Sequence, residues 1–183
     1  KINLLGHSLG GYVSLAFAEK FPEILESMTL FFSTTVADDD EKKQIRKRSI
    51  AVIDENFETF VKTSIPNLFS NNEKDILEGK IELAKNIAKS TNKEGVKAAQ
   101  LGMAERPDRT EILENLDAKI LIIAGKYDNA VKTENLLKII PEKTNIKTYV
   151  LDCGHNGHWE KPTICAEIIN TELFHNLPKH FLL

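Results

Sequence analysis

Apolar residues along the chain follow two patterns. Short, almost wholly apolar runs predict strands buried on both faces, as in a parallel sheet. These runs cover residues 1–5, 28–32, 119–125 and 147–151. Apolar residues at helical spacing occupy residues 12–20, 134–140 and 162–174. Because strands and helices alternate, we predict an α/β fold with a mostly parallel sheet flanked by helices.

The region between the second and third apolar runs has a different character. Residues 38–48 are highly charged, which predicts a solvated helix start with acids near its N-terminus and bases further along. Amphipathic helical patterns follow, without a strand of comparable strength. We therefore expect a core made of residues 1–36 and 115–183, with a helical cap inserted at residues 37–114.

Length and composition restrict the class of protein. A chain of 183 residues suits one domain with a real core. Its net charge of −3 gives no electrostatic reason to expect nucleic acid or an acidic membrane as partner. The longest apolar run is far too short to cross a bilayer. Two cysteines, Cys153 and Cys165, make no disulfide framework, so we expect small buried thiols in a cytoplasmic protein.

The first apolar run leads directly into Gly6-His7-Ser8-Leu9-Gly10, a G-x-S-x-G sequence between a strand and a helix. This context is typical of a nucleophile elbow, a tight turn that presents the serine on strained backbone. Glycines suit such a turn because neighbouring backbone segments approach closely. The following helix would direct its first N–H groups towards the position of an oxyanion.

A serine needs a base and a group that orients the base before it can act as a nucleophile at neutral pH. Asp128 follows the third strand and His155 follows the fourth. Because the carboxyl ends of parallel strands meet at one sheet edge, we expect both side chains to lie near Ser8. The order serine, aspartate, histidine is that of one particular class of serine hydrolases.

Three segments carry a resemblance to the α/β-hydrolase superfamily, in particular to small esterase- and lactonase-like members. They are Gly6–Gly11, Ala124–Asp128 and Gly154–Pro162, the last similar to the family's G-H-x-x-x-x-E-x-P sequence. The resemblance implies that Ser8 is the nucleophile, His155 the base and Asp128 the group that orients it. It also implies that the backbone N–H of Leu9 is one oxyanion donor. No spacing of histidine, cysteine or acidic residues suggests a metal and no phosphate-binding glycine loop is present, so neither a metal nor a cofactor is expected.

Other polar residues near these segments are rival candidates. His158 could replace His155 as the base, although packing near the pocket mouth with Trp159 is the favoured interpretation. Asp152 lies close to His155 in sequence and is interpreted as a cap at the end of its strand. The remaining candidates are interpreted as structural or surface residues: His7, His175, His180 and Cys153.

The resemblance implies a serine hydrolase that cleaves a carboxylic ester, lactone or thioester of a small, partly apolar substrate through an acyl-enzyme intermediate. Hydrolysis of a carbon–carbon bond and perhydrolysis remain alternatives, because the same triad supports them. A non-catalytic binding protein with this fold is the alternative from another class.

In the family the nucleophile strand is central, and the second oxyanion donor lies on a loop that precedes it. We therefore expect a further third of the fold upstream of Lys1, and little activity from residues 1–183 alone. Residues 2–5 would otherwise form an exposed apolar edge, and such an edge recruits other chains. Besides a small-molecule substrate, the only partner expected is a second copy bound at this edge.

Overall fold

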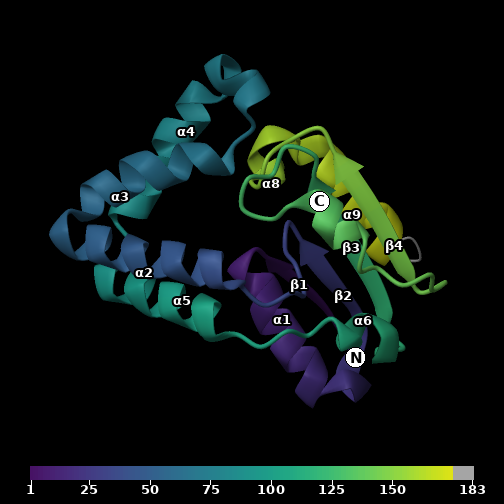
Figure 1. Ribbon diagram of the computed structural model, residues 1–183. Coiled ribbons are helices and arrows are strands. Elements are labelled where there is room, and N and C mark those ends of the chain that lie inside the picture. Colours follow the sequence, from purple (N-terminus) through teal and green to yellow (C-terminus); the bar gives the residue numbers. More distant parts are fainter. Residues whose placement is uncertain (175–183) are drawn as a thin grey trace.

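The computed structural model describes residues 1–174 and contains one parallel sheet of four strands in the order β1-β2-β3-β4 (Figure 1). The strands are β1 (Ile2–His7), β2 (Leu25–Phe31), β3 (Lys119–Gly125) and β4 (Ile146–Leu151). All three pairings are parallel. The predicted α/β fold class is therefore correct. His175 and His180 lie outside the described residues.

Burial differs between the middle and the edge of this sheet. The middle strands β2 and β3 are buried on both faces, as their apolar sequences require. Among the described strands, β1 pairs with β2 alone. Ile2 and Leu5 of β1 are each 43% exposed. The exposed apolar edge predicted from the sequence is therefore present at β1 among the described strands.

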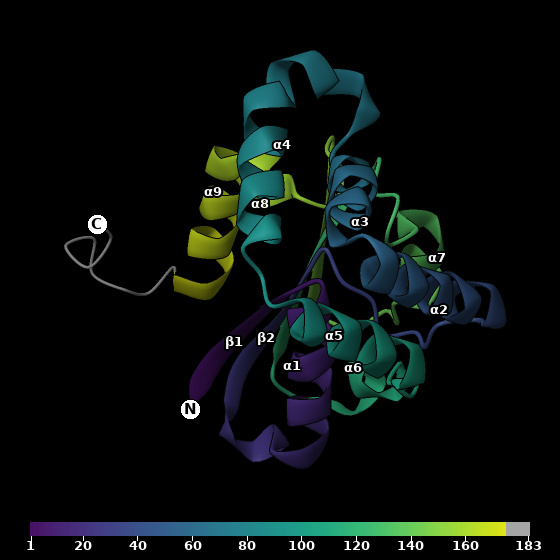
Figure 2. The ribbon, with the colours of Figure 1, turned by 90° about the vertical axis from the view of Figure 1, so that its left-hand side faces the viewer.

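Helices cover both faces of the sheet (Figure 2). On one face, α1 (Leu9–Lys20), α6 (Glu111–Asn115) and α7 (Thr133–Leu137) contribute to the larger apolar cluster. On the other face, α9 (Pro162–Phe174) packs its apolar side against β3. Pro162 begins α9, where a missing N–H costs no hydrogen bond. The short α8 (Gly157–Glu160) precedes it.

The chain between β2 and α6 is helical. It forms α2 (Asp40–Glu55), α3 (Phe57–Ser64), α4 (Lys74–Lys89) and α5 (Lys93–Glu105), with 3₁₀ turns at Ile65–Leu68 and Asn71–Glu73. The helices α2 and α5 lie side by side, and α4 rises away from them (Figure 1). Residue 114, where the sequence placed the end of this region, lies inside α6. Leu113 of α6 already packs in the sheet core.

The charged run at the start of this helical region divides into two parts. Asp39 caps α2 by accepting a hydrogen bond of 2.7 Å from the N–H of Lys42, as a solvated helix start requires. Asp38 is instead buried between the guanidinium groups of Arg46 and Arg106. Burial alone would raise the pKa of Asp38, but these two charges outweigh it and lower the pKa. Asp38 therefore ties the loop after β2 to α2 and to the end of α5.

Among the described residues, none of the helices has the length and apolar character needed to cross a membrane.

Candidate active site

Ser8 lies in the turn between β1 and α1 with φ 51° and ψ −115°, a backbone conformation that non-glycine residues rarely adopt. The turn is held by its backbone. The N–H of Ser8 donates to the carbonyl of Phe31 (3.0 Å), and the carbonyl of Ser8 accepts from the N–H of Gly11 (2.9 Å) and the hydroxyl of Ser33 (2.8 Å). A Cβ on Gly6 would overlap the backbone of Gly10. The sequence therefore forms the elbow that it predicts.

The side chains of Ser8, His155 and Asp128 form one hydrogen-bonded row. Nε2 of His155 lies 2.7 Å from Oγ of Ser8, and Nδ1 lies 2.7 Å from Oδ2 of Asp128. The other carboxylate oxygen of Asp128 accepts from the N–H groups of Ala130 (2.7 Å) and Val131 (2.8 Å). Asp128 is 6% exposed and His155 3% exposed. A carboxylate held in this way fixes the imidazole with a proton on Nδ1, so that Nε2 is free to accept the serine proton.

Leu9 is the first residue of α1, so its N–H has no acceptor within that helix. The positive end of the helix dipole and this N–H group lie next to Ser8 in the chain. The arrangement can stabilise a negative charge that develops on an oxygen bonded to the carbon under attack.

The loops that carry Asp128 and His155 are joined backbone to backbone. The N–H of Lys126 donates to the carbonyl of Leu151 (2.8 Å), and the N–H of Tyr127 donates to the carbonyl of Cys153 (3.0 Å). A Cβ on Gly125 would overlap the carbonyl oxygen of Gly154. Such close contact leaves the two loops little freedom to move apart.

Two further histidines, His7 and His158, lie close to His155. His7 hydrogen-bonds through Nε2 to the backbone carbonyl of His155 (3.1 Å), so that nitrogen carries the proton. Its ring lies 4.6 Å from the ring of His158, centroid to centroid. Burial lowers the pKa of His7 to about 4 and also lowers that of His158. Both rings are therefore neutral at pH 7, and His7 has the structural role expected from the sequence.

Glu160 is a residue of this site for which no role was predicted from the sequence. Its buried carboxylate accepts from the N–H of Gly154, at 3.0 and 3.1 Å, and from the N–H of Ser70, at 3.3 Å. Burial raises the pKa of Glu160, and these N–H groups partly offset the effect. Glu160 is the acidic residue of the G-H-x-x-x-x-E-x-P sequence, and this motif was the signal that could have indicated a role at the site. Its contact with Ser70 could not be predicted, because the two residues are 90 positions apart in the chain.

The remaining rivals lie in less reactive surroundings. The side chain of Asp152 is 72% exposed and pairs with Lys126 at 3.2 Å. Cys153 and Cys165 are buried and free. Burial raises the pKa of both thiols, that of Cys165 to about 11. Neither cysteine therefore carries the thiolate that a nucleophile needs at neutral pH.

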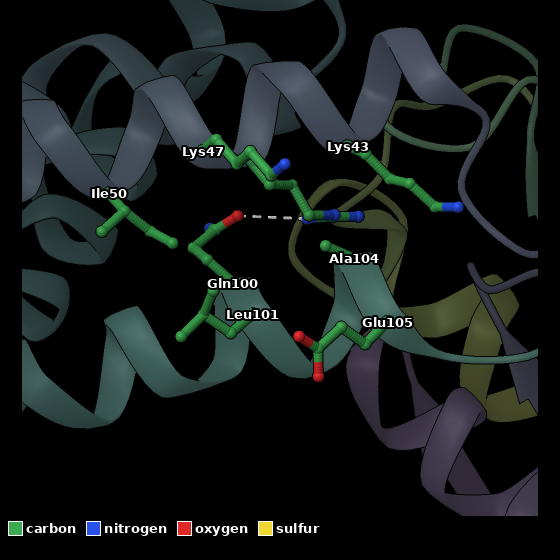
Figure 3. A pocket seen from close by; sticks show the side chains of 8 residues that line it. Lys43, Lys47, Ile50, Gln100, Leu101, Ala104 and Glu105 are labelled. Carbon is green, nitrogen blue, oxygen red and sulfur yellow. Dashed lines mark hydrogen bonds between the residues drawn. The ribbon is translucent and has the colours of Figure 1, made fainter.

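A pocket of about 330 Å³ lies between α2 and α5, and all of its lining residues belong to these two helices (Figure 3). Arg46 lines it and donates from Nη1 to Oε1 of Gln100 at 3.2 Å. Because Arg46 also pairs with the buried Asp38, much of its charge is already neutralised inside the protein. The remaining lining residues are Lys43, Lys47, Ile50, Leu101, Ala104 and Glu105.

Comparison with known proteins finds relatives that include the following three. A thermophilic esterase from Thermogutta terrifontis, solved with malate bound, superimposes with a TM-score of 0.85 at 32% identity, covering 93% of this chain and 64% of the esterase. A Bacillus subtilis protein provisionally named 2-succinyl-6-hydroxy-2,4-cyclohexadiene-1-carboxylate synthase is 26% identical, covering 93% of this chain and 65% of the relative. The 2-hydroxy-6-oxononadienedioate/2-hydroxy-6-oxononatrienedioate hydrolase of Escherichia coli is 25% identical, covering 87% and 58%.

The chain thus spans less than two thirds of the length of each of these relatives. A sequence profile of the alpha/beta hydrolase fold family matches residues 1–162. The match includes the segments around Ser8, Asp128 and His155, and on this ground the chain belongs to the alpha/beta hydrolase fold family.

Proposed function

We propose that the protein is a serine hydrolase that cleaves a carboxylic ester, lactone or thioester of a small, partly apolar substrate. One observation carries this proposal. The hydrogen-bonded row of Asp128, His155 and Ser8 ends on a serine held in a strained elbow, at two distances of 2.7 Å. Such a row supplies an activated nucleophile and a base of fixed tautomer.

The first half of the reaction forms an acyl-enzyme. Oγ of Ser8 attacks the carbonyl carbon while Nε2 of His155 takes the hydroxyl proton. Asp128 accepts the Nδ1–H bond and stabilises the imidazolium that results. The N–H of Leu9 stabilises the oxyanion. The tetrahedral intermediate then collapses with cleavage of the bond to the leaving group, and Nε2 returns the proton to the departing oxygen of an alcohol or enol, or to the departing sulfur of a thiol.

The second half releases the acid. Nε2 of His155, neutral again, takes a proton from a water molecule as the water attacks the ester carbon of acylated Ser8. Collapse of the second tetrahedral intermediate breaks the bond to Oγ, which recovers the proton from His155. Ester substrates are favoured because the Thermogutta terrifontis relative, at 32% identity, is an esterase.

We also propose that residues 37–114 act as a cap over the site. Their segment around Phe69 packs edge-on against Trp159, at 6.4 Å between ring centroids, and Trp159 belongs to the helix that follows His155. Hydrolysis of a carbon–carbon bond is the second candidate, and it is supported by similarity to the Escherichia coli dienedioate hydrolase. The same nucleophile and base serve both reactions.

Labelling of the whole protein with a fluorophosphonate probe tests the proposal, because the probe reacts with activated serines. We expect labelling of the wild type and of Ser49→Ala, which changes a serine on α2, and none of Ser8→Ala. A folded whole protein that takes up no probe would contradict the serine hydrolase function. Cleavage of p-nitrophenyl butyrate rather than of a 2-hydroxy-6-oxodienoate would favour the ester substrate.

A further inference from the structure

Residues 67–70 of the helical region, here called the strap, lie directly on the loop that carries His155. The N–H of Asn156 donates to the carbonyl of Leu68 at 3.0 Å. A Cβ on Gly154 would come within 2.7 Å of the backbone carbon of Phe69 and 2.6 Å of the backbone nitrogen of Ser70. Only a glycine allows this approach.

Glu160 joins the strap and the loop from one side. Both of its carboxylate oxygens lie within 3.3 Å of the N–H of Ser70 and within 3.1 Å of the N–H of Gly154. Hydrogen bonds to an ionised carboxylate are about twice as strong as those between neutral groups. Within residues 1–174, these two amides are the hydrogen-bond donors found for this carboxylate.

The adjacent lysine does not neutralise Glu160. The ammonium group of Lys161 bonds the carboxylate of Glu73 at 2.8 and 3.0 Å. A buried carboxylate without a cation at hydrogen-bond distance depends on its N–H partners. The hydrogen bonds to Gly154 and Ser70, ahead of the more distant charge of Lys161, therefore offset the desolvation of Glu160.

We propose that Glu160 is a positioning residue for His155, acting through the N–H of Gly154, and that it couples the strap to the base of the triad. The inference rests on the function proposed above. Gly154 immediately precedes His155, so a displacement of its backbone moves the imidazole. The bond of 2.7 Å from Nε2 to Ser8 leaves little tolerance, and a misplacement of about 1 Å can cost about 100-fold in rate.

Four substitutions, one each at Glu160 and Glu73 and two at Ser70, separate this role from a merely structural one. Glu160→Gln keeps the shape but replaces one acceptor by a donor that faces two N–H groups. We expect kcat for p-nitrophenyl butyrate to fall about 10- to 100-fold, with KM changed less than about threefold. Glu73→Gln removes a carboxylate whose hydrogen-bond partner, within residues 1–174, is Lys161. It is the matched control and should change kcat less than about twofold.

Ser70→Pro tests the coupling to the strap on its own. Ser70 has φ −60° and ψ 136°, which proline can adopt. The substitution therefore keeps the backbone angles of the strap, but it replaces the N–H donor by a ring carbon that pushes the Glu160 carboxylate away. We expect kcat to fall several-fold, whereas Ser70→Ala, which keeps the N–H, leaves kcat near the wild-type value. Equal kcat values for the two Ser70 variants would overturn the coupling.

A proton NMR measurement keeps this inference distinct from the proposed function. The Nδ1–H of His155 bonded to Asp128 gives a downfield resonance whether or not the protein turns over substrate. We expect this resonance to weaken or shift in folded Glu160→Gln and to persist in Glu73→Gln. Such a change in a protein that takes up no probe would support the positioning role while the hydrolase function failed. An unchanged resonance together with unchanged kcat in Glu160→Gln would overturn the positioning role.

Discussion

The site and the helical region between β2 and α6 are held together in different ways. At the site, glycines let backbone segments touch. A Cβ on Gly6 would overlap main-chain atoms of the first turn of α1, and a Cβ on Gly125 would overlap those of the loop before His155. In the helical region, Gly79 and Gly102 have open space around them. A pocket of about 330 Å³ lies between part of α2 and part of α5 (Figure 3). Backbone contact therefore fixes the site, and side chains join the helices.

The ionic contacts show the same difference. In the helical region, Lys97 of α5 pairs with Asp54 of α2 (2.6 Å), and Lys62 pairs with Glu58 on the surface of α3 (3.3 Å). Exposed ion pairs of this kind contribute little to stability. The buried carboxylates Asp128 and Glu160 are instead held by backbone N–H groups of the site loops. Asp38, buried between two arginines, is the exception within the helical region. We conclude that the site tolerates change less than the helices do.

Asp128→Asn tests whether the site tolerates little change, and it should have the largest effect on kcat. The oxygen that accepts from Ala130 and Val131 can remain in place, so the loop keeps its shape. The new amide group then faces His155 and imposes the wrong tautomer. We expect kcat for p-nitrophenyl butyrate to fall about 10³- to 10⁴-fold, with little change in melting temperature.

Asp152→Asn is the control for this prediction, since Asp152 lies three residues before His155 but is exposed and pairs with Lys126. Its kcat should stay within about twofold of the wild type. A large loss in Asp152→Asn with little loss in Asp128→Asn would reverse the two assignments.

Two glycine substitutions compare the regions by stability. Gly125→Ala should lower the free energy of unfolding by about 3 kcal/mol, because the new methyl group overlaps the carbonyl oxygen of Gly154. Gly102→Ala in the exposed part of α5 should raise it by up to about 1 kcal/mol, since alanine favours the helix and meets no neighbour. Urea unfolding measures both. If both substitutions lowered, or both raised, the free energy of unfolding, the proposed difference between the site and the helical region would be wrong.

Much of the fold follows from the sequence because buried parallel strands have a strong local pattern. The run Lys119–Gly125 is a strand with the predicted bounds, and Pro162–Phe174 is a helix with the predicted bounds. The burial of Asp38 does not follow from the pattern. Its charge run looks like a solvated helix start, and its partner Arg106 is 68 positions away. Tertiary contacts of this kind leave no periodic signal.

The candidate site divides in the same way. Ser8, Asp128 and His155 each follow a predicted strand, and parallel pairing brings the ends of such strands to one edge. The structure places their side chains within hydrogen-bond distance, while their catalytic roles stay a prediction. The contacts of Ser33 with Ser8 and of Glu160 with Ser70 depend on how distant loops meet. The spacing of residues in the local sequence does not predict these contacts.

Substitution of His7 should have the smallest effect on stability. It tests whether water is excluded from the buried region around His7 and His155. Its pKa is about 4 in the folded protein, because of burial, and 6.5 in the unfolded chain. Between these values the unfolded state binds a proton that the folded state does not, so stability is full above pH 6.5 and is lost as the pH falls. From pH 7 to pH 5.5 this histidine should lower the free energy of unfolding by about 1 kcal/mol. His7→Gln keeps a donor for the carbonyl of His155 but cannot titrate, so its urea midpoint should depend less on pH. Parallel pH profiles for the two proteins would mean that water reaches His7, and that the backbone contacts around the site do not seal it.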